Sequence, residues 1–242
     1  MLAMAGTLLT ASASAGGCNP ETIREGRAGE ITGATTFRLT DGQDVQLAAI
    51  LPGGTATRDA LSRHVQGRAV TLRGAAIPDR YGRLVALVYV ENQTEPVQTV
   101  LVRSGEAVVS GFGGTTLDCV RDLLAAEQAA RGNRRNYWSE TAAIKNAERA
   151  DDISPWIGQF VVAEGKIASV REAGGTVYVN FGRRWTRDFA VVISKRQVRG
   201  FEAAGIGPKT LEGRVVRVRG FVEERGGPRI EAFGPEQIEL VR

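Results

Sequence analysis

Two runs of alternating apolar and polar residues, separated by Asp41-Gly42, constrain the fold more than any other feature of the sequence. The apolar members of the two runs are Phe37, Leu39, Val45, Leu47 and Ala49. Successive side chains of a strand point to opposite faces, so each run has one apolar face to bury. Asp-Gly favours a two-residue hairpin turn, in which both central residues need positive φ. The pattern therefore predicts a β-hairpin over residues 31–52.

The length and composition favour two small, β-rich domains. The chain has 242 residues, enough for two domains of ordinary size, and combines 30 glycines with only 6% aromatic residues. Many glycines and few aromatics suit short strands joined by tight turns. The expected fold class is mainly β with α (α+β). The patterns predict helices at 57–66, 117–131 and 194–204, and strands at 69–72, 84–90, 160–170, 176–181, 189–193, 215–222 and 229–233.

The first 20 residues are typical of a secretory signal peptide. They contain no charge, and Leu2, Leu8 and Leu9 lie among small residues that end in Ala-Ser-Ala cleavage candidates. A basic start is missing, so a disordered tail is the alternative. The run is too short and too weakly apolar to span a bilayer. We expect an exported protein, periplasmic or secreted, without an integral membrane span.

Cys18 and Cys119 are the two cysteines of the chain. In an exported protein two cysteines are readily paired, which predicts a Cys18–Cys119 disulfide. Lipid modification of Cys18, which would make the chain a lipoprotein, is the second possibility, and two unrelated buried thiols are the third. With one histidine and no metal-ligand spacing, the sequence predicts no zinc site.

Four short motifs follow the hairpin in order. They are Asp79-Arg80-Tyr81-Gly82-Arg83, Leu101-Val102-Arg103-Ser104-Gly105-Glu106-Ala107, Ala126-Glu127-Gln128-Ala129-Ala130-Arg131, and Trp138. Their order and spacing, from about residue 28 to residue 138, resemble those of the staphylococcal nuclease (thermonuclease) family. The resemblance implies a five-stranded barrel of the oligonucleotide-binding (OB) type with helices packed on it. We therefore predict a thermonuclease-like domain at residues 21–138.

The residues that carry chemistry in that family are mostly replaced here. The first-strand Asp-Gly-Asp-Thr of the family, which supplies calcium ligands, corresponds to Thr32-Gly33-Ala34-Thr35. Gln46 replaces an arginine that binds phosphate in the family, and Leu51 replaces an aspartate that binds calcium. The glutamate proposed as the general base of the family is absent after Pro52. Among the family's catalytic and metal-binding positions, only Arg83 is retained. Calcium needs several oxygen ligands at once, so we predict no metal, no cofactor and no confident catalytic residue.

Two alternatives concern this predicted site. Asp41-Gly42-Gln43-Asp44 is an alternative candidate for the metal motif, but its place between two alternating runs makes it a turn. For Arg83, a structural ion pair with Asp79 or Glu91 competes with phosphate contact. A rearranged, calcium-dependent phosphodiesterase site remains the enzymatic alternative.

Residues 155–242 predict a second OB-like β-barrel, after a linker at 139–154. The order strand, strand, strand, helix, hairpin supports it by analogy of fold alone, and a small β-sandwich is the alternative. This unit carries 15 Lys and Arg against 10 Asp and Glu. A weak set of basic and aromatic residues predicts nucleic-acid binding, and consists of Tyr178, Arg183, Arg184, Trp185, Arg187, Arg217 and Arg219. A solvated charged face, with Tyr178 and Trp185 packed over the core, is the competing interpretation.

The sequence favours a non-catalytic protein over an enzyme. The first hypothesis is an exported thermonuclease-like protein, inactive as a nuclease, that acts as a monomer and binds single-stranded nucleic acid or an envelope protein. The second is an active calcium-dependent nuclease with a rearranged site. The third is an envelope structural or interaction protein without a nucleic-acid role.

Overall fold

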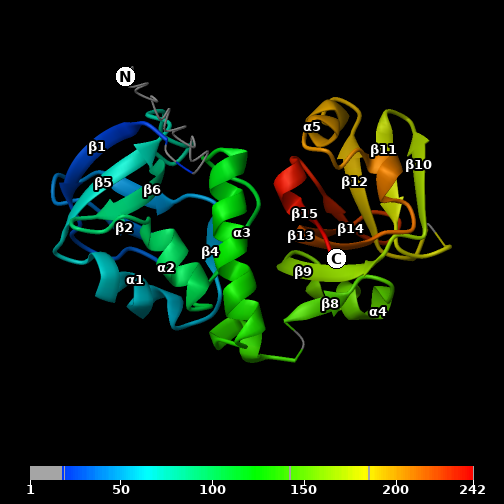
Figure 1. The fold of residues 1–242 in the computed structure, drawn as a ribbon, viewed down its shortest axis with the longest axis horizontal. Coiled ribbons are helices and arrows are strands. Elements are labelled where there is room, and N and C mark those ends of the chain that lie inside the picture. Colours follow the sequence, from blue (N-terminus) through cyan, green and yellow to red (C-terminus); the bar gives the residue numbers. More distant parts are fainter. Residues whose placement is uncertain (1–17, 19, 142, 185, 242) are drawn as a thin grey trace, which may run out of the picture.

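Two β-barrel-like units, one from each half of the chain, make up the computed structural model (Figure 1). The structure describes residues 18, 20–141, 143–184 and 186–241. The elements of the first unit are β1 (Thr22–Arg27), β2 (Thr36–Arg38), β3 (Asp44–Leu47), β4 (Ile50–Pro52), α1 (Thr57–Val65), β5 (Ala69–Gly74), β6 (Leu84–Val90), α2 (Val97–Arg103), β7 (Ala107–Val109) and α3 (Leu117–Gly132). Those of the second are β8 (Ile144–Asn146), α4 (Ala150–Ile153), β9 (Phe160–Lys166), β10 (Ser169–Ala173), β11 (Thr176–Asn180), β12 (Ala190–Ser194), α5 (Val198–Ala203), β13 (Val215–Glu224), β14 (Pro228–Glu231) and β15 (Ile238–Leu240).

The predicted hairpin is confirmed in β2 and β3, which pair antiparallel with Phe37 opposite Val45. Gly42 has a φ of +95° in the turn, but Asp41 does not have a positive φ, so the predicted two-residue turn is not formed. Leu39 N donates to Gln43 O and Gly42 N donates to Leu39 O, which makes a three-residue loop with Gly42 in the left-handed conformation. The hairpin is shorter than predicted, because β4 leaves it and pairs with β7 instead. Ala49, between β3 and β4, has a φ of 60°. Glycine adopts this left-handed conformation without the steric cost that the Cβ of alanine brings.

The first unit has the strand order β1-β5-β6-β3-β2, with β3 and β6 parallel. Just beyond β1 the chain changes partners within two residues. Ala28 N donates to Arg68 O, at the β5 side, and Gly29 N donates to Arg38 O, at the β2 side. The two ends of the strand path are therefore joined by one continuous stretch, as a five-stranded barrel of the OB type needs.

The second unit repeats this connectivity. Its strand order is β10-β11-β12-β14-β13-β9-β8, with β12 and β14 parallel. Between β9 and β10, Ile167 N donates to Arg214 O and the next residue, Ala168, donates to Asn180 O. One bent stretch again bonds to strands on both sides, β13 on one side and β11 on the other, while β8 lies outside this closure and pairs with β9. In both units a helix lies in sequence between the two parallel strands, α1 between β3 and β6 and α5 between β12 and β14.

Residues 139–154 are more ordered than the predicted linker. Residues 144–146 form β8, which pairs in parallel with β9, so the second sheet begins inside the expected linker. The pattern also missed β15, a three-residue strand that pairs with β13. Strands this short carry too little local periodicity to be recognised without their partners.

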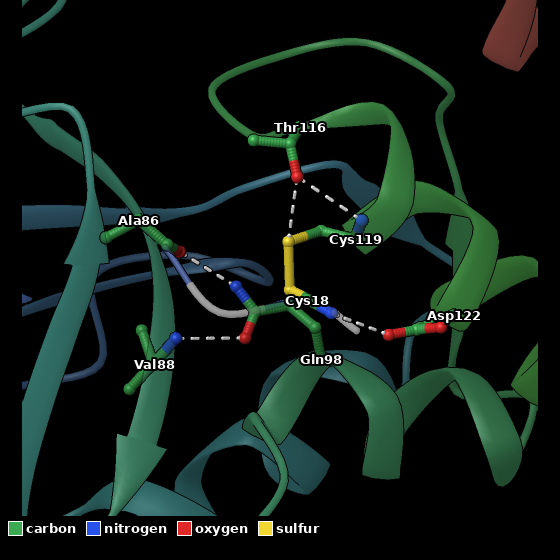
Figure 2. The surroundings of a disulfide bond; sticks show 7 residues. All are labelled: Cys18, Ala86, Val88, Gln98, Thr116, Cys119 and Asp122. Carbon is green, nitrogen blue, oxygen red and sulfur yellow. Dashed lines mark hydrogen bonds between the residues drawn. A yellow bond between two sulfur atoms is a disulfide. The ribbon is translucent and has the colours of Figure 1, made fainter. Parts of the chain in front are cut away.

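The predicted disulfide between Cys18 and Cys119 is present and ties the start of the described chain to α3 (Figure 2). Thr116 caps the helix, since its Oγ1 accepts from Cys119 N at 3.4 Å. Cys18 N donates to a carboxylate oxygen of Asp122, one turn further along α3, at 3.0 Å. No helix in the described residues is long and apolar enough to cross a membrane.

Candidate functional site

Arg83, the retained family residue, is held by hydrogen bonds inside the protein. Its Nε and Nη2 donate to Oδ2 of Asp79, at 2.9 and 2.7 Å, and its Nη1 donates to Oε1 of Gln46 at 3.1 Å. The hydrogen bond from Arg83 holds the pKa of the Asp79 carboxyl below its ordinary value, against an opposing effect of burial. The structural ion pair expected as one alternative for Arg83 is therefore the arrangement observed, with Asp79 as its partner.

Gln46, at the position of the family's second arginine, is also fully engaged. While its Oε1 accepts from Arg83, its Nε2 donates to Thr35 O and Oγ1 at 3.2 and 3.0 Å, and to Leu47 O at 3.1 Å. A second arginine would bring a positive charge to this point, and the glutamine brings none. The polar groups of Arg83 and Gln46 are therefore taken up by hydrogen bonds within the protein.

The site does not fit a calcium ion. Within the part of the chain that the structure describes, no group of three or more His, Cys, Asp or Glu side chains converges closely enough to bind a metal. Asp79, the carboxylate beside Arg83, already accepts from Arg83 and from the backbone N–H groups of Tyr81 and Arg83. Calcium prefers six to eight oxygen ligands, several of them carboxylates.

The Asp41-Gly42 segment is a turn and not a displaced metal motif. Oδ2 of Asp41 accepts from Arg24 Nη2 at 2.6 Å, and Oδ1 of Asp41 accepts from the backbone of Gln43 at 3.1 Å. These two contacts, the arginine first, keep the pKa of Asp41 below its ordinary value. Asp44 pairs separately with Arg38. Each carboxylate of the turn is used within the fold.

Arg219 of the second unit corrects the nucleic-acid prediction. The side chain has no exposed surface, and its guanidinium bonds both carboxylate oxygens of Glu127 on α3, at 3.2 and 3.1 Å. It also pairs with Glu239 and donates to Val109 O in β7 at 2.8 Å. A phosphate has no access to Arg219 in this arrangement. The face of β13 that was expected to bind nucleic acid packs against the first unit instead.

Arg217 lies on the same face of β13 and is likewise occupied. Its Nη2 pairs with Glu164 at 2.5 Å, and its Nη1 lies 3.7 Å from Glu239. Phe221, the next residue on this face, contacts the ring of Phe112 from the first unit, with ring centroids 6.0 Å apart. The sequence showed which side chains share a face, but the burial of that face depends on a partner from the other half of the chain.

Glu127 is the centre of the contact between the two units. It is fully buried, and besides Arg219 it pairs with Arg131 one turn along α3, at 2.7 Å, and accepts from Val109 N at 2.8 Å. Burial disfavours ionisation of the neighbouring Glu239, but the charges of Arg219 and Arg131 outweigh it and lower the pKa of that carboxyl. Burial likewise opposes the charge on Arg219, and Glu127 and Glu239 raise its pKa. The units are joined by a buried, mutually compensated set of charges.

The remaining predicted binding residues lie around the loop between β11 and β12. Arg183, Arg184 and Arg187 are exposed there, and Arg184 lies 3.8 Å from Asp188. Tyr178 is half-buried in β11. Trp185 lies outside the described residues. A hollow of about 510 Å³ is lined by Arg184 and Arg187 of this loop and by Arg149 before α4. Sequence reasoning did not include Arg149, because its approach to the loop comes only from the fold.

Comparison with known families supports the resemblance at the first unit. Residues 40–140 match the model of the family described as staphylococcal nuclease homologue. The chain contains a staphylococcal nuclease-like domain. The match begins in the hairpin and ends two residues after Trp138, so the nuclease-like domain excludes the second unit. No curated protein matches the chain in a sequence comparison.

The nuclease-like domain keeps the motifs that hold its fold better than those that carry its chemistry. Glu127 and Arg131 of the Ala-Glu-x-x-Ala-Arg motif form a buried ion pair, and Arg131 also lies over the ring of Trp138 at 5.6 Å. These matched residues stabilise the packing of α3. Arg83, which the resemblance places at a catalytic position of the family, forms an ion pair with Asp79.

Proposed function

We propose that this is an exported protein whose nuclease-like domain is catalytically silent and which acts by binding. The main support for the proposal is that the Arg83 guanidinium donates hydrogen bonds to Asp79 and Gln46 within the protein. The disulfide supports export, because such bonds persist in oxidising compartments.

Phosphodiester hydrolysis makes two demands that this site does not meet. The charge that develops on the phosphate oxygens must be neutralised, and a water must be activated. In the described residues around Arg83, the acidic group available is Asp79, and its lone pairs already accept hydrogen bonds. One arginine, itself paired, supplies neither a metal site nor a base.

The ligand of the proposed binding function is single-stranded nucleic acid at the loop between β11 and β12. Exposed Arg183 and Arg187 have no ion-pair partner among the described residues. The hollow beside Arg187 is also lined by Arg149, which lies 3.7 Å from Asp152, and by the carboxylates of Glu148, Asp151, Asp188 and Glu224. Cationic loops on small barrels follow the phosphate backbone, and the interaction is tolerant of base sequence. Since Arg217 and Arg219 are engaged inside the protein, the phosphate contacts that remain are three exposed arginines of this loop: Arg183 and Arg187, and also Arg184, whose ion pair with Asp188 at 3.8 Å is a weak, exposed one.

A cleavage assay tests the silent site. The full chain is incubated with single- and double-stranded DNA in millimolar calcium, beside an active calcium-dependent nuclease. We expect no cleavage above the rate without calcium. Calcium-dependent cleavage that disappears in Arg83→Ala would refute the proposal, because it would show that the paired arginine still works on phosphate.

A salt titration with a labelled oligonucleotide tests the binding surface. Three phosphate contacts to a single strand predict a log–log salt slope of about −2. The double variant Arg183→Ala/Arg187→Ala should weaken binding and flatten this slope. Arg196→Ala/Arg199→Ala is the matched control, because both residues are exposed beyond the opposite end of β12 and the charge change is the same. Equal effects of the two double variants, or no binding at low salt, would contradict this surface.

A further inference from the structure

The loop between β5 and β6, residues 75–83, exposes an apolar tip at one end of the nuclease-like domain. Residues 75–78, Ala-Ala-Ile-Pro, are all exposed, and Ile77 keeps 83% of its surface open, the highest value for a large hydrophobic residue in the described chain. Tyr81, four residues later, is 64% exposed. Scattered exposed hydrophobic residues are common on protein surfaces. Here four consecutive residues, 75–78, are exposed, and Tyr81 follows in the same loop.

The loop is held in place from within. Oδ1 of Asp79 accepts from the backbone N–H groups of Tyr81 and Arg83, at 2.9 and 3.0 Å, while its other oxygen binds the Arg83 side chain. Asp79 N also donates to Arg83 O at 2.9 Å, and Gly82 O accepts from Gln43 Nε2 of the neighbouring turn. A loop fixed in this way loses little conformational entropy when its tip meets a partner.

The charges around the tip suit an anionic surface. Arg80 is exposed, with its guanidinium 4.8 Å from the centre of the Tyr81 ring. The carboxylates of the adjoining turn and loop are ion-paired, Asp41 with Arg24, Asp44 with Arg38 and Asp79 with Arg83. Glu21 and Arg73, on the strand ends beneath the loop, carry opposite charges. The exposed positive charge next to the apolar tip is therefore that of Arg80.

The beginning of the described chain lies at the same end of the domain. Gly74 N, at the base of the loop, donates to Glu21 O at 3.0 Å, and Thr22 lies opposite Arg73. The disulfide fixes Cys18, three residues before Glu21, to α3 (Figure 2). The described chain therefore begins at the end of the domain that carries the loop.

We propose that loop 75–83 docks the protein on the surface of a phospholipid bilayer. Ile77 enters the boundary between headgroups and acyl chains, and Tyr81 lies at headgroup level, where a ring with one apolar and one polar end is stable. Arg80 contacts lipid phosphate. The tip is too small to insert deeply, so the association is peripheral and is strengthened by anionic lipid.

Sedimentation with vesicles tests the docking in the full chain. Neutral phosphatidylcholine vesicles are compared with vesicles that also contain phosphatidylglycerol. We expect binding to both, with tighter binding to the anionic vesicles. Ile77→Asp should weaken the partition coefficient about tenfold on both, since an apolar side chain is lost from the interface. Arg80→Ala should lower only the preference for anionic lipid, by about fivefold.

Phe233→Asp is the matched control, because Phe233 is 58% exposed on the second unit and the variant makes the same change of charge. It should bind vesicles like the unchanged protein. Absence of vesicle binding, equal losses in Ile77→Asp and Phe233→Asp, or unchanged binding in Ile77→Asp would overturn the proposal. If Ile77→Asp instead weakens oligonucleotide binding and leaves vesicle binding intact, the loop is a nucleic-acid contact and the proposal is wrong.

Discussion

The two units of this protein share one strand connectivity and use their charged side chains in different ways. In both, two adjacent residues switch strand partners, Ala28 and Gly29 in the first and Ile167 and Ala168 in the second. In the nuclease-like domain, Arg83 is paired within its own unit, with Asp79. In the second unit, Arg219 reaches across to Glu127. A basic residue on a barrel strand therefore indicates a binding site for an anionic ligand only where the fold does not hold it in an ion pair inside the protein.

The contact between the units also differs from an ordinary interface between domains. Interfaces between domains of one chain are commonly polar and solvated. Here the central pair, Arg219 and Glu127, is fully excluded from solvent, with Arg131 and Glu239 completing the set. Removal of one charge from a buried set leaves its partner uncompensated, which costs far more than the net contribution of the pair.

The largest expected effect is the loss of Arg219. Arg219→Ala should destabilise the protein by about 3–5 kcal/mol, because Glu127 and Glu239 remain buried without their main counter-charge. Urea unfolding measures the change. The double variant Glu127→Gln/Arg219→Met removes both charges and should recover much of the loss. An effect of Arg219→Ala below 1 kcal/mol would show that the units are not held by this set.

Reduction of the disulfide should have the next largest effect. The bond links residues 101 positions apart in sequence. The chain-entropy model assigns such a loop about 4–5 kcal/mol of stabilisation, and removal of a native disulfide typically costs about 2–5 kcal/mol. Cys18→Ser/Cys119→Ser should lower the free energy of unfolding of the nuclease-like domain by about 2–5 kcal/mol. An intact mass that shows two free thiols or a lipidated Cys18 in the isolated protein would contradict the bond.

A smaller effect is expected at Asp79, the internal partner of Arg83. Asp79→Ala removes the acceptor of two backbone N–H groups and of the guanidinium, with a cost of about 1–3 kcal/mol in thermal or urea unfolding. Asp41→Ala, which removes an exposed ion pair, is the control, and it should cost clearly less than Asp79→Ala. Similar costs for the two variants would mean that the Arg83 set contributes no more than a surface contact.

The smallest expected effect is the acid sensitivity of Glu239. Its pKa is lower in the folded protein than the ordinary value of 4.5, so its contribution is complete above that value and is lost as the pH falls through the folded pKa. Stability should therefore decline more steeply below pH 4.5 in the unchanged protein than in Glu239→Gln. Unfolding curves at several acidic pH values measure this difference. Identical pH dependence in both proteins would contradict the lowered pKa.

Local pattern predicted much of the fold, and the long-range contacts account for what it missed. Alternation and the Asp-Gly turn predicted β2 and β3, and the apolar stripe predicted α3 within one residue of its ends. The strands β4, β8 and β15 have three residues each and are defined by partners distant in sequence. Their sequences hold too few residues to show a period.

The contacts of the candidate site could be predicted from the sequence only in part. Ala34, Gln46 and Leu51 stand where the resemblance places the family's ligands, and the structure adds that Gln46 joins Arg83 to Thr35. The roles of Arg217 and Arg219 could not be read from the sequence, because a strand pattern gives the face of a residue but not what covers that face. Glu127 was visible as a motif residue, but nothing in the motif indicated a partner 92 positions away.

Calcium binding by the intact protein tests most directly the claim that internal hydrogen bonds have replaced the metal site. A ligand present at 100 times its dissociation constant stabilises a folded protein by about 2.7 kcal/mol, which is easily seen as a rise in melting temperature. We predict the same melting temperature in millimolar calcium and in excess chelator. A calcium-dependent rise that is abolished in Asp79→Asn would contradict the account, because it would place a working metal ligand beside Arg83.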